Sequence, residues 1–185
     1  MPDAIALAQQ AGGRTQLCIA TSFTCPFDGQ VDPNLVIAIA NDPRAEDAAD
    51  IVICDTLGQA HPGQVSSLIS RVVAETPQRE IVFHGHDTWG AGVSNALAAV
   101  QAGASVVDGS LGGLGGCPFA PGASGNTATE DLLFAMRPEW LTPDRFARIV
   151  RSSEGLLTEL DEPNRSKARQ GARSKAPAFD WVLPD

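Results

Sequence analysis

The stretch "EIVFHGHDTWGAGVSNALAAVQAGASVVDGS", residues 80–110, predicts a strand, a helix and a second strand in direct succession. Its two ends, 80–86 and 104–110, are short apolar runs rich in β-branched residues, and their hydrophobicity is continuous rather than alternating. Such runs are typical of strands buried on both faces of a parallel sheet. The alanine-rich segment 90–102 between them has a helical pattern that ends at Gly103, a residue type favoured just after a helix.

The same alternation extends toward the N-terminus. Residues 17–20 and 50–55 are two further strand candidates, and helical patterns cover 33–48 and 62–76. Asn41-Asp42-Pro43 interrupts the first of these patterns, so two short helices are expected there. The fold class predicted is therefore α/β: a partial TIM barrel of about four βα units with parallel strands.

Four βα units are half of an eight-stranded barrel. Residues 1–12, 130–136 and 143–160 also have helical patterns, and the composition then turns polar. We therefore expect residues 1–160 to form the C-terminal half of a TIM-barrel domain and residues 161–185 to form a polar, mobile tail.

The charge of the chain argues against nucleic acid as a partner. Residues 1–140 hold 15 acidic residues and five arginines, which gives −10, and the last 45 residues hold eight basic and seven acidic residues, which gives +1. An acidic body of this kind repels a phosphate backbone. We interpret the basic segment "NRSKARQGARSK" as a solvated surface.

Neither a membrane nor a secretory route is indicated. No apolar run approaches the roughly 20 residues that a membrane-spanning helix needs, and Met1-Pro2-Asp3 lacks the basic start of a signal peptide. The four cysteines form no CxxC pair, so free thiols in a cytoplasmic protein are expected.

Polar residues follow the predicted strands at the edge where parallel βα folds place their functional groups. His84 and His86 are two apart on one strand, so both side chains project to the same face. They are either half of a metal site or a hydrogen-bonded pair of core histidines. Asp55 follows another strand as a ligand, a base or a helix cap, and its residue type favours the cap. Asp108 also ends a strand, and Asp87 should face outward in a structural role.

The loop after the last strand, "SLGGLGGCPFAPGASGN" (110–126), can be neither helix nor strand because it is rich in glycine and proline. It carries Cys117 on the same rim as the histidines. A thiol there is either an incidental loop residue or a catalytic acid, base or nucleophile. Cys18 and Cys54 lie within apolar strands and are predicted to be inert core thiols.

Taken together, the motifs "FHGHDT", "GGLGGCP" and "GASGN" closely resemble those of the hydroxymethylglutaryl-CoA lyase family, which belongs to the metal-dependent lyases and synthases built on a TIM barrel. The resemblance continues through "CDTLGQAHPGQV" and "TSFTCPFDGQV" and covers roughly residues 15–136, which correspond to strands 5–8 of the family's barrel. Related synthases share the HxH strand end but not the cysteine loop.

The resemblance implies a role for each matching residue. It makes His84 and His86 metal ligands, Asn126 an amide-oxygen ligand, Asp55 an active-site carboxylate and Cys117 the catalytic loop cysteine. The implied metal is Mg or Mn, and the implied substrate is an acyl-CoA, 3-hydroxy-3-methylglutaryl-CoA, cleaved to acetyl-CoA and acetoacetate by a retro-Claisen reaction.

One departure from the family bears on activity. Nothing in residues 1–16 corresponds to the family's Arg-Asp pair on the first strand, in which Asp completes the metal site. We therefore expect cleavage to need a separate N-terminal half-barrel as partner. The alternatives are a non-catalytic half-barrel that associates as a homodimer, or a related carbon–carbon synthase or aldolase.

Overall fold

A computed structural model describes residues 1–116, 122–176 and 178–183. These residues form two compact units, Met1–Asp108 and Gly109–Asp185. The division falls at the end of the last strand, whereas the sequence placed its boundary at residue 160. Each unit is described by itself below.

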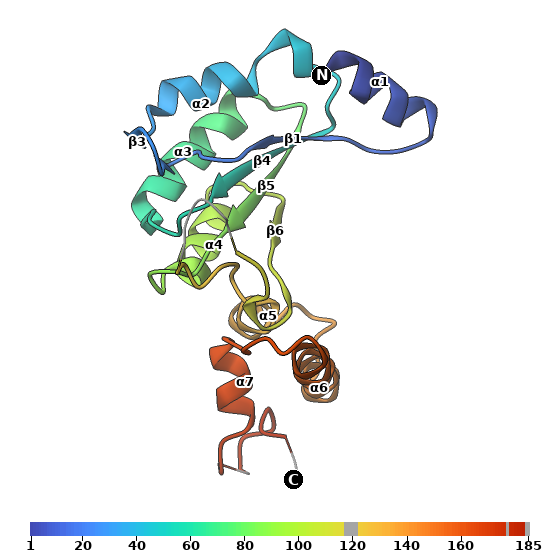
Figure 1. Ribbon diagram of the computed structural model, residues 1–185, viewed down its shortest axis with the longest axis vertical. Coiled ribbons are helices and arrows are strands. Elements are labelled where there is room, and N and C mark those ends of the chain that lie inside the picture. The colour runs from blue at the N-terminus through green and yellow to red at the C-terminus, as the bar shows by residue number, and fades with distance from the viewer. Residues whose placement is uncertain (117–121, 177, 184–185) are drawn as a thin grey trace. The chain divides into compact units, whose positions relative to one another are not determined.

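The first unit is built on a parallel sheet of four strands (Figure 1). In spatial order these are β1 (Gln16–Ile19), β4 (Asp50–Asp55), β5 (Glu80–Gly85) and β6 (Val106–Asp108). Each of the four strands that the sequence predicted is present, and all three pairings are parallel. The α/β class and the partial-barrel topology are confirmed, and within the described residues the sheet is open rather than closed into a barrel.

One face of the sheet is packed against helices. The helices are α2 (Pro33–Ala40), α3 (Pro62–Glu75) and α4 (Gly92–Gln101), which Figure 1 shows along the same side. The odd-numbered side chains of β4 and β5 form the apolar core on one face and are at most 1% exposed: Ile51, Ile53, Ile81 and Phe83. The even-numbered side chains alternate with them, because successive residues of a strand point to opposite faces. Val52, Cys54 and Val82 form a small separate cluster on that second face, next to His84.

Caps and prolines set the helix limits close to those predicted. α2 begins at Pro33 after Asp32, whose carboxylate accepts the N–H of Asn34 at 2.9 Å. It ends at Ala40, and a short 3-10 helix (Pro43–Ala45) follows the predicted interruption. α1 (Pro2–Gln10) is the predicted first helix. A hairpin of two short strands, β2 (Thr24–Cys25) and β3 (Gly29–Gln30), was not predicted.

An arginine ties together the starts of three strands. Arg14 lies just before β1, and its Nη2 is 2.5 Å from Asp50 Oδ1 at the start of β4 and 2.5 Å from Glu80 Oε2 at the start of β5. The hydrogen bonds from Arg14 lower the pKa of Asp50 below its usual range. This carboxylate is buried and would be costly to leave unpaired.

This ion pair predicts a specific loss of stability in acid. Because the pKa of Asp50 is lower in the folded than in the unfolded chain, its stabilisation is complete above the unfolded value of ~3.9 and disappears as pH falls through the folded value. Asp50→Asn should therefore lower the free energy of unfolding at pH 7 and flatten its fall below about pH 4. Urea unfolding across that range measures both effects, and an unchanged acid slope in the variant would contradict the assignment.

The second unit contains a 3-10 turn, η2 (Leu111–Gly113), and the helices α5 (Thr129–Met136), α6 (Pro143–Glu159) and α7 (Lys167–Ala172). Its core is a cluster of buried side chains from the loop before α6, from α6 and α7, and from the segment after α7: Leu141, Phe146, Ala147, Val150, Ala172 and Leu183. The Trp181 ring packs on Phe146 with ring centroids 5.5 Å apart.

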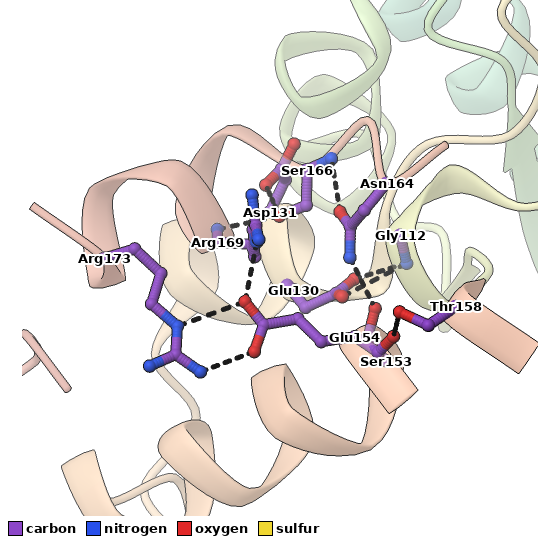
Figure 2. A network of polar contacts seen from close by, with 10 residues as sticks. All are labelled: Gly112, Glu130, Asp131, Ser153, Glu154, Thr158, Asn164, Ser166, Arg169 and Arg173. Atoms are coloured by element: carbon purple, nitrogen blue, oxygen red, sulfur yellow. Dashed lines mark hydrogen bonds and ion pairs between the residues drawn. The ribbon is translucent and has the colours of Figure 1, made fainter. Parts of the chain in front are cut away.

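The segment after residue 160 differs from the mobile tail that the sequence predicted. It forms α7, and Ala172 and Leu183 are 4% and 6% exposed within the core of the second unit. Polar contacts hold it, as Figure 2 shows: Arg169 Nε and Arg173 Nη2 lie 2.7 and 2.5 Å from the carboxylate of Glu154 on α6. Hydrogen bonds and ion pairs, rather than a long apolar face, attach this segment to the rest of the second unit, which agrees with its polar composition.

None of the helices among the described residues combines the length and the apolar character needed to cross a membrane.

Candidate active site

The two histidines predicted as ligands lie together at the carboxyl end of β5. Their ring centroids are 5.3 Å apart, and the rings are inclined at 73°. His86 is 5% exposed, whereas the His84 side chain is 28% exposed. The alternation of the strand places both on the face opposite the helix-packed core, as the spacing predicted.

Asp108 fixes the orientation of His84. Parallel register sets Asp108 of β6 opposite His84, and Asp108 Oδ1 lies 2.6 Å from His84 Nδ1. This hydrogen bond raises the pKa of His84 above its usual value, while burial opposes the shift. In the neutral tautomer with the proton on Nδ1, the Nδ1–H group donates a hydrogen bond to the Asp108 carboxylate. The lone pair of Nε2 then points away from Asp108 and can accept a hydrogen bond or bind a metal.

His86 is held in its neutral form. Burial lowers the pKa of this imidazole, and the nearby His84 lowers it further. Its Nδ1 is buried and has no hydrogen-bond partner among the described residues. A buried polar nitrogen without a partner is costly, and a neutral imidazole is the form that binds metals. The pair of histidines thus fits a divalent ion, with Asp108 as the carboxylate behind one ligand.

Asp55 holds the loop that follows β4. Its two carboxylate oxygens accept the N–H groups of Gln59 and Ala60, each at 3.1 Å. Burial raises the pKa of the Asp55 carboxyl, and these N–H groups partly offset the shift. The helix cap that its residue type favoured is not seen: α3 begins at Pro62 with His61 as its N-cap, and Asp55 instead orders the loop before that helix. Asp55 lies in the odd-numbered series of β4, so its side chain leaves the sheet on the face opposite His84.

The loop held by Asp55 contacts the backbone beside His86. Gly58 has φ +64, and a Cβ at this position would lie 2.9 Å from the carbonyl oxygen of His86 and 3.0 Å from the nitrogen of Thr88. Only glycine permits that approach and that conformation together. Asp87 lies between His86 and Thr88. Its carboxylate accepts the N–H of Gly92 at the start of α4, at 2.7 Å, and this contact is the kind of structural role that was expected of Asp87.

Asn126 belongs to the second unit, where its amide is fixed by the glycine-rich loop. Its Nδ2 donates to the carbonyl oxygen of Leu114 at 2.8 Å, which leaves the Oδ1 oxygen as the group able to bind a ligand. Cys117, the predicted loop cysteine, lies outside the described residues.

The two strand cysteines are not both core residues. Cys54 is buried as predicted, but Cys18 is exposed, and the two sulfurs are 3.5 Å apart. The interaction with Cys54 lowers the pKa of the Cys18 thiol to about 6, and the same contact raises the pKa of Cys54. The prediction was wrong for Cys18 because β1 lies at an edge of the described sheet.

The role of Asp108 was not evident from the sequence. Asp108 stood out there only as one polar residue at a strand end, because its pairing with His84 depends on the register between β5 and β6. The signal available in the sequence was that Asp108 is a polar residue at the end of the strand that follows the strand with His84 and His86.

An open sheet of parallel strands alternating with helices, with two histidines and a carboxylate at the carboxyl ends of its strands, has the architecture of half a TIM barrel, a fold whose functional groups gather at that edge. The HMGL-like family model matches residues 1–152, so the chain belongs to the HMGL-like family.

Named relatives are hydroxymethylglutaryl-CoA lyases. The chain is 34% identical to the cytoplasmic lyase of Danio rerio, over 92% of this chain and 51% of that protein. It is 33% identical to the lyase of Bacillus subtilis, over 90% and 56% of the two chains. The chain thus spans about half the length of these curated relatives.

Solved structures of HMG-CoA lyases show the same similarity over about half of their length. The Bacillus subtilis HMG-CoA lyase superimposes with a TM-score of 0.83 at 32% identity, covering 94% of this chain and 58% of that one. An Acinetobacter baumannii lyase in complex with coenzyme A and 3-methylmalate gives 0.79 at 32% identity, covering 95% and 57%. The carboxyl transferase domain of Rhizobium etli pyruvate carboxylase, at 21% identity and a TM-score of 0.62, shares the fold alone.

Proposed function

We propose that this chain provides half of a hydroxymethylglutaryl-CoA lyase site and takes part in the retro-Claisen cleavage of 3-hydroxy-3-methylglutaryl-CoA to acetyl-CoA and acetoacetate. The observation that carries the proposal is the arrangement of Asp108, His84 and His86 at the rim of a sheet that belongs to this family.

The residues that would hold the metal are His84, His86 and Asn126. Two imidazoles with an amide oxygen suit Mg or Mn, and the ion would supply a Lewis acid for the oxygen of the substrate hydroxyl. Among the described residues, no group of three or more His, Cys, Asp and Glu side chains could by itself hold an ion. A carboxylate ligand from a second polypeptide, a separate N-terminal half-barrel, would complete the set.

The chain's own residues would divide the remaining work. Cleavage removes the proton of the tertiary hydroxyl, breaks the adjacent carbon–carbon bond and leaves the enolate of acetyl-CoA, which must take up a proton. We assign that proton donation to the thiol of Cys117, the residue that matches the family's catalytic cysteine. Asp55 acts as a positioning residue, because its carboxylate orders the loop 56–60 that abuts the backbone of His86.

The partner and compartment belong to the same proposal. The Acinetobacter lyase was solved with coenzyme A bound to it, and we propose an acyl-CoA as the substrate of this chain. Association is proposed with an N-terminal half-barrel, and a homodimer is the competing arrangement. The relatives' names include both cytoplasmic and mitochondrial lyases, and a cytoplasmic location for this chain stays a prediction.

The test is cleavage of hydroxymethylglutaryl-CoA by the purified chain with Mg or Mn, alone and with the N-terminal half of the Bacillus subtilis lyase added. Metal-dependent acetoacetate is expected with the added half and should be abolished by Cys117→Ala but not by Cys25→Ala. A folded mixture that produces no acetoacetate would overturn the proposal. Acetyl-CoA consumption with a 2-oxo acid would instead identify a synthase.

Asp108→Asn isolates the carboxylate behind His84. Loss of a carboxylate that hydrogen-bonds to a metal-binding histidine typically weakens metal binding by about 10- to 100-fold. We expect a loss of Mn²⁺ affinity in that range, measured by electron paramagnetic resonance. Glu75→Gln, on the exposed side of α3, should leave the affinity unchanged. Equal Mn²⁺ affinity in Asp108→Asn and the unaltered chain would exclude His84 as a ligand oriented by Asp108.

A further inference from the structure

Two cysteines meet on neighbouring strands of the first unit. Cys18 of β1 and Cys54 of β4 have their Sγ atoms 3.5 Å apart. In the parallel register Cys18 pairs with Val52, so Cys54 is two residues farther along β4 and projects from the same face. The two thiols are therefore neighbours by strand pairing and not by a chance loop contact.

The pair has a fixed order of access. Cys18 is exposed, whereas Cys54 is 4% exposed. A reagent from solution can reach the Cys18 sulfur, and Cys18 is the cysteine that contacts Cys54 among the residues that the structure describes. Cys25 is partly exposed and lies 3.5 Å from a carboxylate oxygen of Asp28 rather than from a second thiol.

We propose that Cys18 and Cys54 form a reversible disulfide by exchange with a low-molecular-weight disulfide. The Cys18 thiolate attacks one sulfur of the small disulfide, which releases one small thiol and leaves a mixed disulfide on Cys18. Cys54 then attacks the Cys18 sulfur, and its proton passes to the departing small thiolate, which leaves as the second small thiol. Two protein thiols are oxidised, and one small disulfide is reduced to two thiols.

Formation of this bond requires the two strands to adjust. The sulfurs must approach from 3.5 Å to the ~2.05 Å of a disulfide, and β1 is at an edge of the described sheet, where a strand can adjust. Ser22 keeps the strands together beside the pair: its hydroxyl accepts the N–H of Cys54 at 3.3 Å and donates to the carbonyl of Ile19 at 2.9 Å.

The disulfide would form next to the candidate active site, because Cys54 lies directly opposite His84 in the β4–β5 register. The proposal does not depend on the lyase function, since its chemistry needs only the two thiols. It assigns the chain an oxidation site on the same face of the sheet as the histidines.

The experiment uses the full chain as the double variant Cys25→Ser/Cys117→Ser, which retains only the proposed pair. After treatment with oxidised glutathione and alkylation of free thiols, the intact mass should show loss of two hydrogens, no glutathione and no alkyl groups. Adding Cys54→Ser to this background should stop the reaction at one glutathione on Cys18. Dithiothreitol should restore two alkylatable thiols.

Three results would overturn the proposal in variants with native circular dichroism: a persistent glutathione adduct on the two-thiol variant, two thiols that remain alkylatable, or a covalent dimer. If the double variant does not fold, peptide mapping of the oxidised unaltered chain decides the question. A cross-linked Cys18–Cys54 peptide supports the proposal, and Cys18 linked instead to Cys25 or Cys117 contradicts it.

Discussion

Gly125→Ala is expected to disrupt the glycine-rich loop and to lower the free energy of unfolding of the second unit by about 3 kcal/mol or more. Gly125 is buried at φ +92, a conformation that L side chains rarely adopt. A Cβ there would collide with the carbonyl oxygen of Gly115 and would lie 2.8 Å from its carbonyl carbon. Both atoms are backbone, so no side chain can turn aside to make room.

Gly122→Ala separates collision from backbone strain. Gly122 has φ +82, similar to Gly125, but no atom of the described part of the chain lies within 4 Å of its Cβ position. This variant should therefore lose only the roughly 1–2 kcal/mol of an unfavourable backbone conformation. Urea unfolding monitored by tryptophan fluorescence measures both variants. Equal losses at the two positions would show that the close approach of Gly125 to Gly115 contributes nothing.

The same pair of variants tests the proposed ligand Asn126, which follows Gly125 directly. Because the side chain of Asn126 donates to Leu114 in the segment that would be displaced, Gly125→Ala should also weaken Mn²⁺ binding. Gly122→Ala should leave Mn²⁺ binding close to that of the unaltered chain. Loss of binding in both would place the effect on the backbone of the loop and not on Asn126.

Asp131→Ala is expected to release α7 from α5. Figure 2 shows the Asp131 carboxylate at the start of α7, where it accepts the hydroxyl of Ser166 at 2.7 Å. It also accepts the N–H groups of Lys167 and Ala168 at 3.1 and 2.7 Å. Hydrogen bonds to a charged group are worth roughly 1.5–3 kcal/mol each. We therefore expect a loss of about 3 kcal/mol or more and rapid amide exchange throughout Lys167–Ala172.

Asp144→Ala is the matched control, because this aspartate is an exposed residue in the first turn of α6. It should cost less than about 1 kcal/mol, the usual value of an acidic residue near a helix start. Hydrogen exchange with mass spectrometry resolves the two helices. Protection of α7 that survives Asp131→Ala would mean that the apolar contacts of Ala172 and Leu183 suffice to hold it.

The alternation of strands and helices was predictable because each element carries its own local signal. Strands such as 50–55 are continuous β-branched runs, and Pro33, Pro62 and Pro143 mark the first residues of three helices. The hairpin β2–β3 was missed because its strands are two residues each, too short to show a periodicity.

The candidate site was predictable only in part. The projection of His84 and His86 to one face follows from the spacing of the strand. The pairing of Asp108 with His84, and of Cys18 with Cys54, depends on which strands are neighbours and in what register. Those relations join residues 24 and 36 positions apart, so no local pattern contains them. The roles of Asn126 and Cys117 come from the family resemblance and remain predictions.

Gly112 in the turn η2 has a consequence for how the second unit responds to change. Both oxygens of Glu130 accept its N–H, at 3.1 and 2.8 Å, and its carbonyl oxygen accepts the N–H of Arg165 at 2.9 Å. Ordering of this turn and docking of the segment before α7 therefore depend on hydrogen bonds of the same residue. Thermodynamic linkage then makes the coupling reciprocal: ordering of the turn favours docking of the segment by the same factor by which docking favours ordering of the turn.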